Sequence, residues 1–263
     1  MTASTSSEPV RVYWQPGCTS CLRTKEFLTH HGVAFESRNV LADESAFEEL
    51  ARFGLRQVPI VTKGAEWANG QVLADVARVA GIPWGGAKIL PVAELQRRLA
   101  AILAGTERFL GQLPEEALIR CIPNRPRTYA ELAYHIFNIA DAFLEHEDGI
   151  PLTFESYNRV PGPGAGTKAA LLAYGRGVQD RLAAWFDGPG RNAGWTERAN
   201  VYYGEQTLHE FLERTTWHAG QHARQLMWVL ENNGIAPDGP LGPEVFQGLP
   251  MPDMIWDDEK SAA

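Results

Sequence analysis

The pattern of apolar and polar positions divides the chain into two parts with different periodicities. In the first part, short apolar runs typical of buried strands alternate with helical patterns, several of which end at a glycine. The predicted strands cover residues 10–14, 33–40, 58–62 and 65–67, and the predicted helices cover about 22–31, 44–53 and 72–80. The resulting order, β-α-β-α-β-β-α, predicts an α/β domain.

The second part has helical spacing of its apolar residues. A stretch rich in glycine and proline, residues 81–91, places a domain boundary between the two parts. The helices predicted beyond it cover residues 92–110, 128–147, 167–187 and 207–233, and the segments 149–166 and 234–263 are predicted to be irregular. Four amphipathic helices form a bundle. We therefore expect an α/β domain over residues 9–83 and an all-α four-helix bundle over residues 90–250.

Composition narrows the classes of partner. The 263 residues are 44% hydrophobic, which allows a sizeable core, and the formal net charge is −8. A negative net charge argues against nucleic acid or an anionic membrane as the main partner, because both attract a basic face. The sequence has no run of 18 apolar residues, and its first eight residues lack the apolar region of a signal peptide. We therefore expect a cytoplasmic protein without a nucleic acid or membrane partner.

The three cysteines include one closely spaced pair, Cys18-Thr19-Ser20-Cys21, which directly precedes a predicted helix. So few cysteines fit a reducing cytoplasm better than a secreted disulfide framework. At a helix N-terminus, the helix dipole and free backbone N–H groups favour the thiolate form of cysteine. We predict Cys18 as the attacking thiolate and Cys21 as the resolving thiol. The alternative, half of a zinc site, has no second cysteine pair to complete it.

This layout, with C-x-x-C between the first strand and the first helix, is that of a thioredoxin-like domain, and residues 9–82 resemble a glutaredoxin. The resemblance implies that the peptide bond before Pro59 is cis and that this proline packs beside the dithiol. It also implies that a low-molecular-weight thiol binds to the residues around this proline and to a turn before the last helix. The matching positions are Gln57, Val58, Pro59, Gly70 and Gln71. Gln57 replaces the usual threonine, and Thr19-Ser20 is not the common dipeptide, so the identity of the thiol stays open.

Two histidines, His218 and His222, lie one turn apart in the last predicted helix, with both imidazoles on the same face. This is the spacing that a metal requires of two ligands on one helix. Leu226 and Leu230 continue the stripe, which predicts that both histidines point toward an interior. His135, on the second predicted helix of the bundle, is the best candidate for a third nitrogen ligand. Three ligands would leave positions open for water or substrate; a core histidine without a metal is the alternative for His135.

The region from about residue 90 to residue 250 resembles DinB/YfiT-like four-helix bundles. The resemblance rests on Leu132-Ala133-Tyr134-His135 and on Trp217-His218-Ala219-Gly220-Gln221-His222. In that superfamily one histidine of the second helix and two of the fourth bind a divalent metal, which implies His135, His218 and His222 as ligands. Many members use the metal with a cytosolic thiol such as mycothiol, bacillithiol or glutathione, as transferases, isomerases or detoxification enzymes. Zinc, nickel and iron all suit three imidazoles, so the identity of the metal stays open.

Together these features predict an enzyme, a thiol-disulfide oxidoreductase fused to a metal-dependent thiol transferase. The bundle metal would activate a low-molecular-weight thiol or a small electrophilic substrate for S-transfer, and the dithiol would reduce the resulting mixed disulfide. One alternative is a general glutathione-type disulfide oxidoreductase whose bundle only binds metal or substrate. Another is a stress-linked sensor of metal or thiol, which would form a homodimer through the bundle.

Several other residues carry secondary predictions. Asn138 and Asp141 follow His135 on its helix, and either could orient a ligand, although a solvated helix face suits Asp141 equally. Arg125 and Arg127 are expected on an ordinary surface, with a substrate carboxylate as the alternative. A small buried hydrophobe is the expectation for Cys121. The remaining histidines, expected outside the metal site, are His30, His31, His146 and His209.

Overall fold

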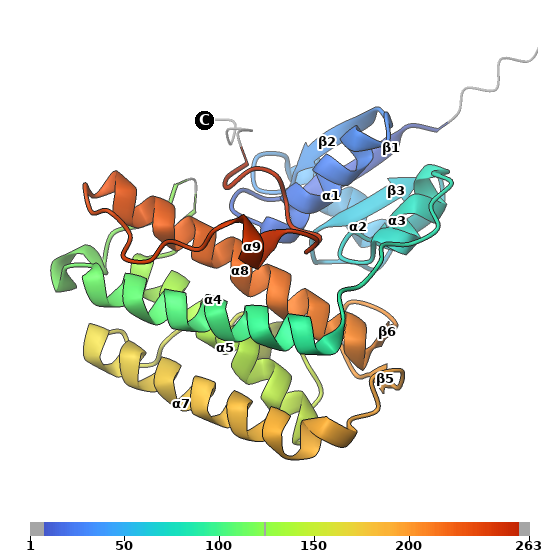
Figure 1. Ribbon diagram of the computed structural model, residues 1–263. Helices are drawn as coiled ribbons and strands as arrows, with labels where there is room; N and C mark the ends of the chain where they lie inside the picture. The colour runs from blue at the N-terminus through green and yellow to red at the C-terminus, as the bar shows by residue number, and fades with distance from the viewer. Residues whose placement is uncertain (1–7, 124, 258–263) are drawn as a thin grey trace, which may run out of the picture. The chain divides into compact units, whose positions relative to one another are not determined.

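The computed structural model describes residues 8–123 and 125–257 (Figure 1). The chain divides into two compact units. The first contains the described residues up to Gly86 together with those from Pro252 onward, and the second runs from Ala87 to Met251. The segment 252–257, which the sequence analysis placed in neither domain, thus belongs to the first unit.

The first unit is built on a four-stranded sheet with the strand order β2-β1-β3-β4. β1 pairs in parallel with β2 and antiparallel with β3, which in turn pairs antiparallel with β4. The strands are β1 (Val10–Trp14), β2 (Phe35–Asn39), β3 (Ile60–Lys63) and β4 (Glu66–Asn69), and the helices are α1 (Thr19–His30), α2 (Glu44–Arg52) and α3 (Leu73–Ala80). The element order and the thioredoxin-like fold predicted from the sequence are confirmed.

Both faces of this sheet are covered by helices. Successive residues of a strand point to opposite faces, and on β1 Val12 lies in one core cluster and Tyr13 in the other. The cluster around Val12 includes Leu28 of α1 and Val76 of α3, whereas the cluster around Tyr13 includes Leu50 of α2. The end of β1, and with it the loop that leads to the dithiol, is therefore fixed from both sides of the sheet.

The segment from Pro252 to Asp257 lies against α1. The carboxylate of Glu26 accepts hydrogen bonds from the backbone N–H groups of Asp253 and Met254, at 2.7 and 3.1 Å. The ammonium group of Lys25 lies 2.6 Å from the carboxylate of Asp257, and both side chains are more than nine-tenths buried. This tail has no periodic pattern, so the sequence analysis did not predict these contacts.

The second unit is the predicted four-helix bundle. Its helices are α4 (Val92–Gln112), α5 (Tyr129–Glu147), α7 (Lys168–Asp187) and α8 (Leu208–Asn232). Each packs mainly against two others, in the cyclic order α4-α8-α5-α7 (Figure 1). The two helices that carry the candidate metal ligands, α5 and α8, are therefore neighbours. Of the helices in the described residues, none is both long and apolar enough to cross a membrane.

The two helices that carry the candidate metal ligands, α5 and α8, each begin at a capping box. Thr128 accepts a hydrogen bond from the backbone N–H of Glu131 at 3.1 Å, and the Glu131 carboxylate accepts one from the backbone of Thr128 at 2.7 Å. Thr207 and Glu210 repeat this arrangement at the start of α8. Each box pairs two N–H groups that have no partner within the helix. A fixed helix start determines the turn on which each histidine lies.

Two segments predicted to be irregular contain short elements. The connection over residues 149–166 contains α6 (Phe154–Tyr157), and the tail contains α9 (Pro243–Phe246). The remaining short elements are 3-10 helices at Glu115–Ala117 and Pro189–Asn192 and a two-stranded pair of β5 (Arg198–Ala199) with β6 (Gln206–Thr207). Elements this short contain too few positions to show a helical or strand period, which is why α6 and α9 were missed.

Candidate functional site

The cysteine pair lies at the N-terminus of α1. Cys18 is the N-cap residue, and its Sγ accepts a hydrogen bond from the backbone N–H of Cys21 at 3.2 Å. The two cysteines form a disulfide in the structure. Cys18 is partly exposed, whereas Cys21 is completely buried. A reaction partner from solvent therefore reaches only Cys18, which is what the predicted roles of attacking and resolving cysteine require.

Two of the predicted thiol-binding positions, Pro59 and Gly70, meet beside the first turns of α1. The peptide bond between Val58 and Pro59 is cis, as predicted, and the backbone N–H of Gly70 donates to the carbonyl of Pro59 at 2.9 Å. A Cβ atom added at Gly70 would lie 2.8 Å from both Pro59 Cβ and Thr24 Oγ1. Thr24 Oγ1 is also 2.8 and 2.7 Å from the carbonyl oxygens of Ser20 and Gly70. Glycine is therefore required where this turn meets the helix that begins at the dithiol.

The other three predicted positions flank this contact. Gln57 and Val58 are partly exposed, and Gln71 is buried. The backbone N–H of Gln71 donates to Oδ1 of Asn69 at 3.0 Å, and its carbonyl accepts from Arg23 of α1 at 3.4 Å. These positions border the same turn, and binding of a thiol there stays a prediction.

A second cluster lies between α5 and α8. His135 of α5 and His218 and His222 of α8 are each more than nine-tenths buried. One nitrogen of each ring lies within 4.8 Å of those of the other two. The Nε2 atoms of His218 and His222 are 3.0 Å apart. The ring of His135 faces both edge-on, at centroid distances of 5.6 and 4.9 Å. The structure thus brings together the three histidines that the sequence analysis selected.

Two neighbouring side chains hold the outer nitrogens of the α8 histidines. Nδ1 of His222 lies 2.7 Å from Oε1 of Gln225, and Nδ1 of His218 lies 3.0 Å from the hydroxyl of Tyr157. Both Nε2 atoms therefore face the centre of the cluster. Nδ1 of His135 is buried, with no hydrogen-bond partner among the residues that the structure describes. An unpaired buried nitrogen costs free energy, so this atom fits a site that receives a ligand.

Burial keeps all three imidazoles neutral. It lowers the pKa of His222 to about 3, with the positive charge of Arg127 as the second cause. The pKa values of His135 and His218 are also lowered well below the ordinary range, mainly by burial and next by Arg127 for His135 and by His222 for His218. A neutral imidazole offers a nitrogen lone pair, which is the form that binds a metal.

The expectation that Arg125 and Arg127 lie on an ordinary surface is wrong. Arg127 is only 9% exposed, and burial lowers its pKa to about 9; Arg125 is half-buried. Local backbone pairing explains this, because Cys121 bridges to Thr128 and the N–H of Ile122 donates to the carbonyl of Arg127 at 2.9 Å. The segment before α5 is thereby folded back on itself. Both arginine charges lower the pKa values of all three histidines.

Asn138, one turn after His135 on α5, reaches the cluster indirectly, through Tyr157. Its amide nitrogen donates to the carbonyl oxygens of Ser156 and Tyr157, at 3.1 and 3.2 Å. The hydroxyl of Tyr157 in turn contacts His218. Tyr157 was not predicted from the sequence, because it lies in a connection without periodicity. Gln225 was not predicted either, although a spacing of three residues from His222 places both on one helix face.

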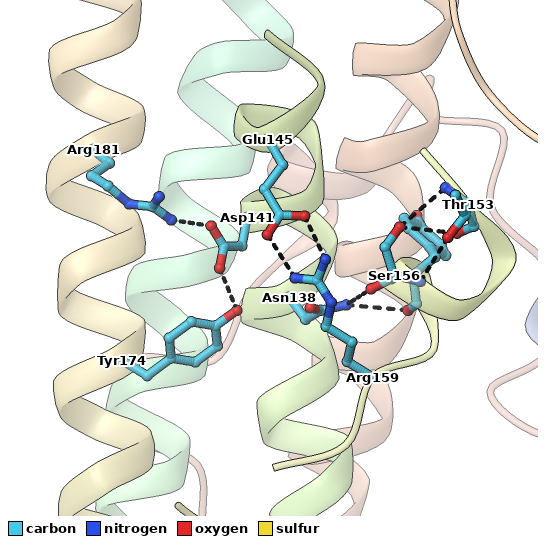
Figure 2. A network of polar contacts seen from close by, with 9 residues as sticks. Asn138, Asp141, Glu145, Thr153, Ser156, Arg159, Tyr174 and Arg181 are labelled. Carbon is cyan, nitrogen blue, oxygen red and sulfur yellow. Dashed lines mark hydrogen bonds and ion pairs between the residues drawn. The ribbon is translucent and has the colours of Figure 1, made fainter. Parts of the chain in front are cut away.

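Two other predictions are corrected by the structure. Asp141 is 8% exposed, so it does not lie on a solvated face; it accepts from the Tyr174 hydroxyl at 2.7 Å and pairs with Arg181 of α7 (Figure 2). Its carboxylate therefore joins α5 to α7 through these two partners. Cys121 is exposed, not buried, because the turn that buries Arg127 begins there.

The remaining histidines lie outside the three-histidine cluster. His30 and His31 are exposed at the end of α1. Nε2 of His146 accepts the backbone N–H of Asn200 at 2.9 Å, and Nε2 of His209 lies 2.8 Å from the carbonyl of Leu90.

Comparison with known families separates the same two regions. The glutaredoxin family matches residues 10–67, and the DinB superfamily matches residues 48–226, which is more than half of the chain. The second match begins within the first unit, whereas the bundle of the structure begins after Gly86.

The similar curated proteins align with parts of the chain. The glutaredoxin-like protein NrdH of Lactococcus lactis is 28% identical over 71 residues, which cover 27% of this chain and 99% of NrdH. The global transcriptional regulator Spx 2 of the same species is 35% identical over 43 residues, 16% of this chain and 33% of Spx 2. The chain thus spans about a third of the length of that regulator. A crystal structure of a thioredoxin-like protein is 31% identical, with 27% of this chain and 96% of that chain covered and a TM-score of 0.26.

The first unit therefore combines a thioredoxin-like sheet, a Cys18–Cys21 pair and a glutaredoxin match, so it is a glutaredoxin-like thiol–disulfide redox domain. The second unit combines a four-helix bundle with a match that extends over most of its length. The chain belongs to the DinB superfamily and carries a glutaredoxin domain in front of its helical bundle.

Proposed function

We propose that the protein is a thiol-dependent metalloenzyme whose bundle binds a divalent metal, namely zinc, nickel or iron. The observation that carries the proposal is the convergence of His135, His218 and His222, with one nitrogen of each ring within 4.8 Å of the other two. The cosubstrate would be a low-molecular-weight thiol, either glutathione, mycothiol or bacillithiol, and the second substrate a small electrophile. The dithiol of the first domain would reduce mixed disulfides of the same low-molecular-weight thiol, and so return it to the thiol form that the bundle uses.

The residues of the cluster suit such a metal. Imidazole nitrogen is a ligand of zinc, nickel and iron, and three protein ligands leave positions open for other ligands. Metal–nitrogen bonds of about 2.0–2.1 Å place two nitrogens of one ion roughly 3.0–3.4 Å apart. The Nε2 atoms of His218 and His222 are already 3.0 Å apart. The buried Nδ1 of His135, which has no partner among the described residues, would gain a partner.

When bound, the metal would act as a Lewis acid toward the sulfur of the thiol or toward the electrophile. The chain itself supplies the surrounding charge. Arg125 and Arg127 lower the histidine pKa values, and for the same electrostatic reason they would favour an anionic thiolate over a neutral thiol. The thiol proton would pass to solvent, the sulfur would form a bond to the electrophilic carbon, and the leaving group would depart with the bonding electrons.

The redox step uses the cysteine pair in its reduced form. The Cys18 thiolate would attack a mixed disulfide, release one thiolate and retain the other half as a new disulfide. Cys21 would then attack Sγ of Cys18, release the second thiol and leave the Cys18–Cys21 disulfide, which is the form in the structure. Two equivalents of a low-molecular-weight thiol would reduce the pair again and would themselves be oxidised to their disulfide.

The first test is metal content, measured by elemental mass spectrometry on protein purified without chelator or affinity metal. We expect about one metal ion per chain in the wild type and a loss of this metal in His218→Ala. His209→Ala is the matched control, because this histidine lies on the same helix but contacts the Leu90 carbonyl. Absence of metal from the wild type, even after reconstitution with zinc, nickel and iron in turn, would reject the metalloenzyme.

The second test separates the two chemistries. Thiols and electrophiles would be screened by the formation of thioether product, and dithiol activity by the reduction of a mixed disulfide. Cys18→Ser should abolish the reduction, and His218→Ala should abolish only the thioether formation. If no thiol and electrophile in the screen give a thioether product, and His218→Ala leaves every measured activity unchanged, the chain is a disulfide oxidoreductase with a non-catalytic bundle.

A further inference from the structure

We infer that Tyr157 is a positioning residue for His218 and that Asn138 holds Tyr157 in place; the inference deepens the proposed metal site and rests on it. Tyr157 is 1% exposed, and its hydroxyl lies 3.0 Å from Nδ1 of His218. The two rings are tilted by 42°, with their centroids 5.4 Å apart. The outer nitrogen of His218 therefore faces a group that can either donate or accept a hydrogen bond.

The position of Tyr157 depends on contacts outside its own short helix. α6 has only four residues, too few to be stable alone. Its last turn is attached to α5 through the amide of Asn138, which is completely buried and donates to the carbonyls of Ser156 and Tyr157 (Figure 2). Just beyond α6, Arg159 donates to both carboxylate oxygens of Glu145, at 2.6 and 2.8 Å. Two side chains of α5, Asn138 and Glu145, which lie about two turns apart, thus anchor the segment that carries Tyr157.

The far side of Tyr157 is packed as well. The guanidinium of Arg214, one turn before His218 on α8, lies 4.7 Å from the centroid of the Tyr157 ring and 4.2 Å from that of Tyr203. Arg214 is 4% exposed, so this stack is shielded from water. Tyr157 is consequently fixed by its backbone, by its ring and by its hydroxyl.

The hydrogen-bond directions in the metal-free chain follow from the amide oxygen of Gln225, which can only accept. Nδ1 of His222 must carry a proton to donate to this oxygen, so Nε2 of His222 carries a lone pair. Nε2 of His218, 3.0 Å away, must then donate to it. Nδ1 of His218 therefore accepts from the hydroxyl of Tyr157, which is protonated at neutral pH. The bonds run in one direction from Tyr157 through both histidines to Gln225.

Ligation through Nε2 requires the opposite tautomer of His218. Its proton then lies on Nδ1, and the phenol oxygen of Tyr157 becomes the acceptor. A phenol can make this exchange without moving its ring, because the hydroxyl both donates and accepts. Phenylalanine has the same ring but no oxygen, so Tyr157→Phe would leave a buried N–H of His218 unpaired in the ligating form. Loss of such an outer partner reduces metal affinity by about 10–100-fold.

The test measures cobalt(II) affinity of the full chain by absorbance and chelator competition. We expect about 10–100-fold weaker binding by Tyr157→Phe and a loss in the same direction by Asn138→Ala, which releases α6. Tyr174→Phe is the matched control, because its hydroxyl contacts Asp141, and it should bind within about twofold of wild type. Wild-type affinity in Tyr157→Phe would overturn the inference.

A second measurement works without any metal and so distinguishes this inference from the proposed function. Nitrogen-15 NMR of the metal-free protein should show His218 protonated at Nε2, with an Nδ1 signal that shifts in Tyr157→Phe but not in Tyr174→Phe. If the wild type binds no metal but this signal shifts, the proposed function fails and the positioning contact stands. A proton on Nδ1 of His218 in the metal-free wild type, or an Nδ1 signal unchanged in Tyr157→Phe, would reject the positioning role.

Discussion

Gln225 lies three residues after His222 on α8, and its Oε1 is 2.7 Å from Nδ1 of His222. This single contact determines which nitrogen of His222 carries the proton, because an amide oxygen can only accept. It therefore directs the lone pair of Nε2 toward the other two histidines. A ligand that is oriented in this way loses no further freedom when a metal binds.

The first prediction concerns this contact. Gln225→Leu should weaken cobalt(II) or zinc binding about 10–100-fold, because the outer N–H of His222 loses its buried acceptor. Gln225→Glu should retain or increase the affinity, since a carboxylate accepts the same bond more strongly. Chelator competition measures both variants. If Gln225→Leu and Gln225→Glu bind equally, Gln225 does not orient the ligand.

A second prediction concerns the helix pair α5 and α7. A Cβ added at Gly175 would collide with the ring of Phe137, whereas one added at Gly177 meets no atom within 4 Å. Gly175→Ala should therefore destabilise the bundle by about 1–3 kcal/mol through overpacking. Gly177→Ala, on the exposed face of the same helix, should stabilise it by up to about 1 kcal/mol. Urea unfolding followed by circular dichroism gives both values, and equal effects of the two substitutions would contradict the packing argument.

The convergence of the three histidines was predictable because long helices extend a pattern over many turns. His218 and His222 share a face with Leu226 and Leu230, which lie in the interior. Because that face points inward, a histidine on a neighbouring helix at the same level of the bundle could reach them. The capping boxes at the starts of both helices have sequence signatures of their own.

The partners of these histidines depend on tertiary contacts that leave no periodic signal. Tyr157 is in place because Asn138, which lies 19 residues before it on another helix, donates hydrogen bonds to the backbone of α6. Arg127 is buried because the turn from Cys121 to Thr128 pairs with itself. A charged residue in a short connector is ordinarily exposed, so only the folded backbone shows that this one is not.

A third prediction concerns the tail of the first unit. Lys25 and Asp257 form an ion pair of 2.6 Å with 8% and 9% of their side chains exposed. Asp257→Asn removes the negative charge of a buried carboxylate beside this ammonium, so it should destabilise this unit by more than the roughly 1 kcal/mol of an exposed pair. Asp253→Asn is the control, because the pair of Asp253 with His30 is exposed and should contribute under about 1 kcal/mol. Equal shifts of the urea midpoint in both variants would show that the buried Lys25–Asp257 pair stabilises the unit no more than the exposed His30–Asp253 pair does.

The last prediction is a loss of stability in acid that originates in the cluster. The folded pKa of His222 is about 3, whereas an unfolded histidine titrates near 6.5. Above about pH 6.5 this histidine is neutral in both the folded and the unfolded chain, so it adds no pH dependence to the unfolding free energy. Below this pH only the unfolded chain takes up the proton, so the unfolding free energy of metal-free protein should fall by about 1.4 kcal/mol per pH unit for this histidine. Urea unfolding between pH 6 and pH 4 gives the slope of the unfolding free energy against pH. This slope should be smaller in His222→Gln by about 1.4 kcal/mol per pH unit, which corresponds to one proton. An identical slope in the variant would refute the assignment.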